Sequence, residues 1–123
     1  MNTDTQKHNG SCHCGNVSFS FEHDSEITEG LRCNCSICIR KGAVMSNFVI
    51  SPDKMQVQVT EKGSLGLYAF GNEVAKHFFC KKCGIYPFHT TFRMPGYYRV
   101  NLGCVEGIDS FNVDIEIFDG KSL

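Results

Sequence analysis

Residues 111–117 read Phe-Asn-Val-Asp-Ile-Glu-Ile, an unbroken alternation of apolar and polar side chains. A period of two is typical of a β-strand that is buried on one face and exposed on the other. We therefore expect a strand here, with its apolar side chains facing the core and Asp114 and Glu116 in solvent.

The same alternation recurs along most of the chain, which predicts an all-β fold. It is found at residues 17–21, 55–59 and 98–102, and shorter apolar segments that suit strands lie at 44–50, 65–70, 74–79 and 86–92. No window of twelve or more residues has the apolar spacing of an amphipathic helix. A short turn of helix is expected only near residues 36–41 or after Pro52. Small sheets joined by turns are the architecture that this pattern favours.

Size and charge indicate one small domain with no polyionic partner. The 123 residues suffice for a single domain. Twelve basic and thirteen acidic residues give a net charge of -1, which disfavours a nucleic-acid partner. No segment is apolar enough for a signal peptide or a membrane span. We expect a cytoplasmic protein with no membrane partner, a flexible tail at residues 1–9 and one β domain at residues 10–123.

Eight cysteines are many for a chain of this length. In the reducing compartment expected here, clustered cysteines usually bind metal instead of pairing in disulfides. Seven of them fall into three clusters, whereas Cys104 stands alone. The clusters are Cys12-His13-Cys14-Gly15, Cys33-Asn34-Cys35-Ser36-Ile37-Cys38 and Cys80-Lys81-Lys82-Cys83-Gly84.

The first and third clusters together predict a closed, structural zinc site. A C-x-C pair in an extended segment aims both sulfurs to one side, and a C-x-x-C pair does the same around a tight turn. A glycine follows each pair, as such turns favour. Structural zinc takes four tetrahedral ligands, and the four are Cys12, Cys14, Cys80 and Cys83. One ion would then join the N-terminal hairpin to the middle of the chain. The alternative is two disulfides or inert thiols, although a C-x-C disulfide is strained.

The middle cluster predicts a second zinc with an open coordination position. Cys33, Cys35 and Cys38 supply three protein ligands, and a vacant fourth position is typical of catalytic zinc. A fourth protein ligand would instead close the site, and oxidation of two of the cysteines would lose the metal. The candidates for that fourth ligand are Cys104, His77 and His89. Residues 10–123 are thus expected to form a zinc-binding domain.

An open zinc on three thiolates favours capture of a thiol over activation of water. The site carries a net charge of about -1, so it is a weaker Lewis acid than zinc on three neutral histidines, yet it remains thiophilic. A small thiol bound there stays deprotonated at neutral pH and can act as a nucleophile. Arg32, Arg40 and Lys41 flank the middle cluster, where they can bind the carboxylates of an anionic thiol such as glutathione, with Arg40 and Lys41 the residues we expect to do so. The alternative is that they are solvated surface cations.

Three motifs together resemble the glutathione-dependent formaldehyde-activating enzyme family, which also includes centromere protein V. They are G-S-C-H-C-G at 10–15, C-N-C-S-I-C at 33–38 with R-K-G-A at 40–43, and F-C-K-K-C-G at 79–84. The resemblance extends from about Gly10 to about Phe118. It implies a β-tent of small stacked antiparallel sheets with zinc knuckles. It also implies a structural zinc on the first and third clusters and a catalytic zinc on the middle cluster.

The resemblance further implies carbon–sulfur lyase activity, in which glutathione and formaldehyde interconvert with S-hydroxymethylglutathione. We therefore expect a zinc-dependent enzyme with two zinc ions per chain, acting on small-thiol adducts of formaldehyde or a related aldehyde. Two alternatives remain open: a non-enzymatic zinc-binding interaction module, and a redox or zinc sensor built on the middle cysteines. A basic face in the folded protein would favour the module, whereas a concave pocket over the middle cluster would favour the enzyme.

Overall fold

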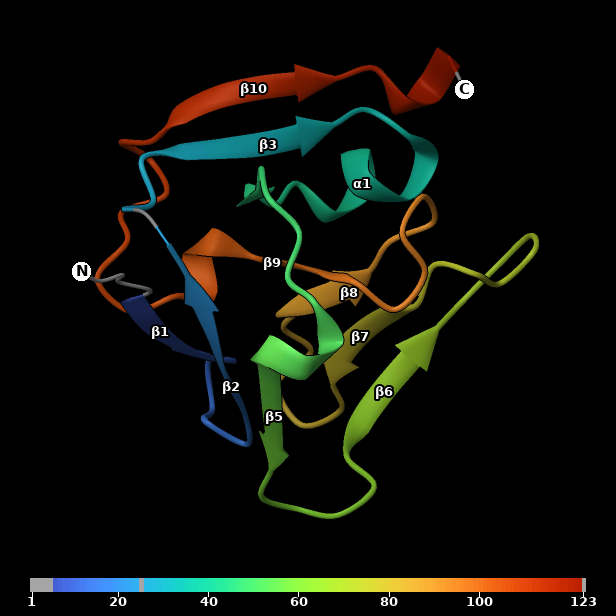
Figure 1. The fold of residues 1–123 in the computed structure, drawn as a ribbon. Helices are drawn as coiled ribbons and strands as arrows, with labels where there is room; N and C mark the ends of the chain where they lie inside the picture. The colour runs from blue at the N-terminus through green and yellow to red at the C-terminus, as the bar shows by residue number, and fades with distance from the viewer. Residues whose placement is uncertain (1–5, 25, 123) are drawn as a thin grey trace.

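Three small sheets form the protein in the computed structural model, which describes residues 6–24 and 26–122 (Figure 1). The first sheet has the order β1 (Gln6–Ser11), β2 (Val17–His23), β5 (Met55–Val59). The second has the order β10 (Asp114–Phe118), β3 (Glu29–Cys33), β4 (Met45–Ser46). The third has the order β6 (Leu65–Tyr68), β7 (His77–Cys80), β8 (Phe88–Thr90), β9 (Tyr98–Val100). In Figure 1, β10 and β3 lie across the top of the molecule, above the other two sheets.

The helical content is small and lies close to where the sequence predicts it. Among the residues that the structure describes, the one α-helix is α1 (Ser36–Lys41), and the 3-10 turns are η1 (Pro52–Lys54), η2 (Leu102–Cys104) and η3 (Gly120–Ser122). Gly42 ends α1 in the left-handed conformation (φ 66°), which glycine adopts without strain. Within the described ranges no helix has the length and hydrophobicity to cross a membrane. The prediction of an all-β fold of small, mostly antiparallel sheets is confirmed.

One core is shared by the first and third sheets. In β2, where apolar and polar residues alternate at 17–21, Phe19 and Phe21 are buried on the same face. Phe19 meets Phe88 of β8 edge to face, with ring centroids 5.6 Å apart, and Phe88 meets Tyr98 of β9 in the same way. Leu102 is completely buried behind these rings. The aromatic residues therefore hold the two sheets at a defined separation, which positions the connections that carry the cysteines.

Part of the expected N-terminal tail, residues 6–9, is a strand. Residues 6–9 belong to β1, which pairs antiparallel with β2 from Gln6 opposite His23 to Ser11 opposite Ser18. The His8 ring stacks on Phe21 at 5.1 Å between centroids, which anchors this polar segment. Residues 1–5 lie outside the described residues. The polar sequence did not indicate a strand because β1 is an edge strand that buries little besides Gly10.

The apolar side chains of the last strand are more exposed than the sequence predicts. β10 pairs parallel with β3, unlike the antiparallel pairings of the other named strands. Ile115 and Ile117 are 41% and 67% exposed, and Phe111 is 95% exposed. Asp114 and Glu116 are exposed, as expected, and Glu116 also lines a cavity beside the strand. The predicted burial of these apolar side chains was wrong, because alternation defines two faces of a strand without indicating which one packs on the core.

Candidate metal centres and the cavity between the sheets

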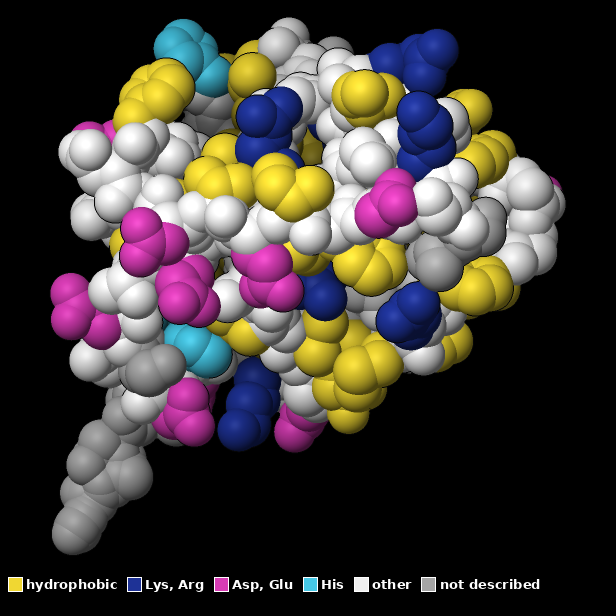
Figure 2. Space-filling view, turned by 90° about the horizontal axis from the view of Figure 1, so that it is seen from above, with side chains coloured by type: hydrophobic (Ala, Val, Ile, Leu, Met, Phe, Trp, Pro, Cys, Tyr) yellow, Lys and Arg dark blue, Asp and Glu magenta, His cyan; other side chains and the backbone are white. Residues whose placement is uncertain are grey.

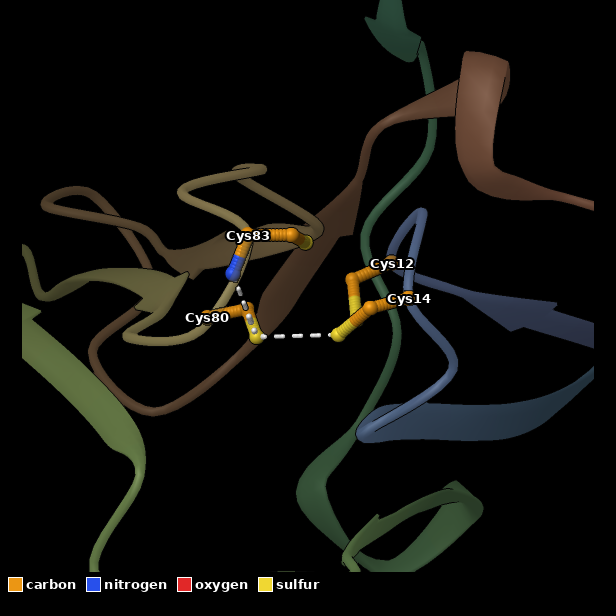
Figure 3. Close-up of side chains that lie close together, drawn as sticks. All are labelled: Cys12, Cys14, Cys80 and Cys83. Carbon is orange, nitrogen blue, oxygen red and sulfur yellow. Dashed lines mark hydrogen bonds between the residues drawn. The ribbon is translucent and has the colours of Figure 1, made fainter.

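The first and third cysteine clusters meet at one point (Figure 3). Cys12 and Cys14 lie at the turn between β1 and β2, Cys80 ends β7, and Cys83 lies in the turn that follows it. Their four Sγ atoms all lie within 4.8 Å of one another, and the Cys12–Cys14 and Cys14–Cys80 Sγ distances are 3.7 Å. Sulfurs placed at about 2.3 Å from a tetrahedral zinc lie about 3.8 Å apart. The four cysteines, all free thiols, therefore fit a zinc ion.

Hydrogen bonds around Cys80 favour the thiolate form that a metal ligand requires. Burial opposes ionisation, but the peptide N–H groups of Cys83 and Lys82 donate to its Sγ at 3.5 and 3.3 Å, and the Asn16 amide donates at 3.7 Å. Together these donors outweigh burial and lower the pKa of Cys80 to about 6. The chain thus stabilises negative charge on this sulfur through peptide N–H groups and the Asn16 amide.

Asn16 is a supporting residue that the sequence analysis missed. It is buried, its Nδ2 donates to Ser64 Oγ at 2.6 Å, and its Oδ1 accepts from the Glu61 N–H at 2.9 Å. One amide therefore connects the first metal centre to the turn between β5 and β6. No feature of the sequence distinguished this asparagine from other polar residues in turns.

The middle cluster forms a second, separate group. Cys33 ends β3, Cys35 is the N-cap residue of α1, and Cys38 lies within the helix. Their Sγ atoms also lie within 4.8 Å of one another, and the Cys35 N–H donates to Cys33 Sγ at 3.4 Å. Three convergent sulfurs at this separation fit a zinc ion that keeps one further coordination position.

The described residues supply no fourth ligand to this middle group. His77 and His89 lie nearby and line the same cavity, but neither is close enough to join the three sulfurs. Cys104 packs against the hydrophobic core beside the first centre. Burial, with the charges of Cys12 and Cys83, raises its pKa to about 11, so it stays a neutral thiol.

A cavity of about 430 Å³ opens over the middle cluster. All three of its cysteines line the cavity, together with side chains from α1, β3, β4 and β10 and from the third sheet. The loop of residues 91–94, between β8 and β9, closes another side. Residues that are far apart in the sequence thus surround the open side of the three sulfurs. This volume suits a small molecule such as a short peptide.

The wall next to the cluster holds a network of one cation, one phenol and two imidazoles. Lys41 Nζ lies 2.6 Å from His77 Nδ1 and 3.5 Å from the centre of the Tyr86 ring. Burial lowers the pKa of Lys41 to about 8, and burial with the charge of Lys41 lowers that of His77 to about 4. The neutral His77 ring therefore accepts from the ammonium. The Tyr86 hydroxyl bonds His89 Nδ1, and burial lowers the pKa of His89 to about 3.

Two further cations face this cavity, and sequence reasoning missed both. Arg99 of β9 donates from Nη1 to the Ser46 carbonyl at 2.9 Å. Arg93 lies with its guanidinium carbon 5.4 Å from the centre of the Phe118 ring. Glu116 supplies the one carboxylate among the described lining residues. Nothing local in the sequence marks these arginines, because only the tertiary fold brings them to the cysteines.

Arg40 and Lys41, which the sequence analysis predicts to bind the anionic thiol, have different surroundings. Lys41 lines the cavity over the cluster. Arg40 points elsewhere: its guanidinium donates to the Ser36 carbonyl at 2.7 Å on the exposed side of α1. It lines a smaller neighbouring cavity of about 240 Å³, which it shares with Lys41. Lys41 therefore lies between the two cavities, as do Ile37, His77 and Tyr86, which also line both.

Comparison with known proteins identifies the same family as the sequence motifs. The family model described as glutathione-dependent formaldehyde-activating enzyme matches residues 7–121. A crystal structure of a Rhodobacter sphaeroides protein is similar, with 34% sequence identity and a TM-score of 0.76. The similarity covers 88% of this chain and 99% of that chain. The chain belongs to the family of the glutathione-dependent formaldehyde-activating enzyme.

Proposed function

We propose that the protein is a zinc-dependent carbon–sulfur lyase that interconverts glutathione and formaldehyde, or a related aldehyde, with their S-hydroxyalkyl adduct. The observation that carries this proposal is the cavity of about 430 Å³ lined by Cys33, Cys35 and Cys38. A buried structural site would need no such space beside its sulfurs. Membership of an enzyme family related to glutathione and formaldehyde supports the same reaction class.

The reaction is a reversible addition that needs no oxidant. The thiol sulfur bonds to the carbonyl carbon, the carbonyl π pair moves to oxygen, the oxygen gains a proton and the sulfur loses one. Zinc on the middle cluster would supply a thiophilic Lewis acid that favours the deprotonated sulfur at neutral pH. The chain itself must bind the thiol, orient the aldehyde and move the proton.

Lys41 is the group placed to exchange the proton with the aldehyde oxygen. Its ammonium faces the cavity beside the cysteines, and it is held there by His77 Nδ1 and the Tyr86 ring. An ammonium in this position stabilises negative charge on the oxygen as the carbon–sulfur bond forms, and then protonates it. In the reverse direction the amine accepts the proton as the bond breaks.

The charges around the cavity complement those of glutathione. At neutral pH that tripeptide carries two carboxylates and one ammonium group. Lys41 and Arg99 offer cations to the carboxylates, and Glu116 offers a carboxylate to the ammonium group. Arg40, in the neighbouring cavity, extends the cationic surface away from the sulfurs.

The first centre has a structural role in this proposal. Its four cysteines join the β1–β2 turn to the end of β7. β7 carries His77, β8 beside it carries His89, and β9 next to β8 carries Arg99, so this join positions one wall of the cavity. Loss of that metal should therefore disturb the fold before it disturbs the chemistry.

The interaction-module alternative predicts a basic face. Figure 2 views the molecule from above β10 and β3, and on that face lysine and arginine side chains are mixed with acidic and hydrophobic ones. This surface gives no support to binding of a polyanion. The sensor alternative predicts that mild peroxide releases zinc from the middle cluster and that a reductant restores binding.

The proposal is tested by nuclear magnetic resonance exchange spectroscopy on glutathione and formaldehyde, alongside elemental analysis of zinc. Wild-type protein should accelerate exchange with the adduct and hold two zinc ions. Cys35→Ser should hold one and lose the acceleration. Cys104→Ser is the matched control, since Cys104 lies outside both ligand groups. Equal exchange rates in wild type and Cys35→Ser would refute the proposed role of the middle cluster.

A further inference from the structure

Much of the wall of the cavity over the middle cluster is apolar. Leu31 of β3 and Met45 of β4 are paired neighbours that both line it. Phe118 of β10 lines it as well, and it is the register partner of Cys33. An apolar surface therefore begins directly beside the sulfurs. Glutathione and formaldehyde, which are both polar, have no group that would bury it.

The rim of the same cavity exposes two more large apolar side chains, Phe92 and Met94. They are 59% and 42% exposed although both line the cavity. Their loop is held in place: the Thr91 N–H donates to the Tyr97 carbonyl at 2.9 Å, and Thr91 Oγ1 donates to the Met94 carbonyl at 2.8 Å. A restrained loop that exposes such side chains at a cavity mouth is typical of a ligand-binding surface.

Arg93 connects the apolar residues of the loop to Phe118 of β10. It lies between Phe92 and Met94 in the loop, and its guanidinium stacks over the Phe118 ring at 5.4 Å. This contact brings the loop and β10 together across the cavity. The apolar surface thus extends from Phe118, next to Cys33, outward to the rim.

We propose, on the basis of the proposed function, that the aldehyde partner carries an alkyl or aryl group of several carbons that packs against Phe92, Met94 and Phe118. The charged end of the thiol then occupies the side of Lys41 and Arg99. The chemistry is unchanged: the thiol sulfur bonds to the carbonyl carbon, and the oxygen gains one proton. The product is the hemithioacetal of a hydrophobic aldehyde and glutathione.

The test measures binding of unreactive analogues by isothermal titration calorimetry on the zinc-loaded protein. The probes are glutathione and its S-methyl, S-butyl and S-hexyl thioethers. Affinity should increase by about twofold to fourfold for each added methylene that becomes buried. In the Phe92→Ser, Met94→Ser double variant this increase should be largely lost. Phe111→Ser is the matched control, because Phe111 is also a large exposed apolar residue but does not line the cavity.

The outcomes separate this inference from the function on which it rests. If glutathione and all three thioethers fail to bind, the proposed function fails. If glutathione binds and chain length brings no gain, the aldehyde inference alone is overturned. A gain that survives in the double variant overturns it too, because the alkyl group then binds elsewhere. As a second readout, exchange with hexanal should exceed exchange with formaldehyde in wild type, and this preference should shrink in the double variant.

Discussion

Replacing Asn16 by alanine should weaken both the fold and the first metal centre. The buried amide forms hydrogen bonds of 2.6 Å with Ser64 and 2.9 Å with the Glu61 N–H. At about 0.5–1.5 kcal/mol each, their loss should lower the free energy of unfolding by about 1–3 kcal/mol. The third interaction, 3.7 Å to Cys80 Sγ, acts on a metal ligand. Loss of such a supporting group typically reduces metal affinity by about 10- to 100-fold.

Two measurements on one variant examine these two effects. Chemical denaturation of the zinc-loaded protein reports the free energy of unfolding. Competition with a chromophoric chelator reports zinc affinity, and only the tighter, structural site should be changed. Asn16→Asp separates the contributions, because it keeps the acceptor for Glu61 but replaces the donor to Cys80 with a negative charge. It should therefore lose zinc affinity at least as strongly as Asn16→Ala while retaining one of the hydrogen bonds.

The result that would refute this reasoning is specific. If Asn16→Ala unfolds within about 0.5 kcal/mol of wild type and binds zinc with unchanged affinity, the amide does not support the centre. Loss of zinc from the middle cluster instead of the first would show that the two centres are not independent.

Three other predictions concern the two centres and the network beside them. Cys80→Ser should lose the structural zinc and unfold at a much lower temperature than Cys35→Ser, as followed by circular dichroism. Gly120→Ala should weaken the middle site selectively in a chelator titration, since its Cβ would lie 2.5 Å from Cys33 Sγ; unchanged affinity would show that the C-terminal turn can move. The folded-state pKa of His89 is lowered from 6.5 to about 3, so the unfolded chain binds the proton first as pH falls. Stability should therefore be lost below pH 6.5, by roughly 2 kcal/mol between pH 7.5 and pH 5, and His89→Gln should show a shallower fall. Parallel acid profiles of the two proteins would contradict that assignment.

Local spacing predicted the parts of the protein that depend on neighbours in the chain. The i, i+2 and i, i+3 separations of the cysteines determine where their sulfurs point, so both ligand groups could be recognised. The short helix at residues 36–41 and the buried face of β2 followed from the same short-range geometry. Among the described residues no fourth His, Cys, Asp or Glu joins the middle cluster, and an open coordination position there stays a prediction.

By itself, then, the sequence determined an all-β chain with two cysteine groups suited to zinc. Only the tertiary structure decided that Ile115 and Ile117 are exposed instead of buried in the core and that Glu116 lines the cavity, because a period of two is the same whichever face is buried. The tertiary structure also decided that Arg99 lines the cavity over the middle cluster and that Arg40 does not. Those positions depend on how β9, β10 and α1 pack against one another, and no residue's immediate neighbours in the chain encode that packing.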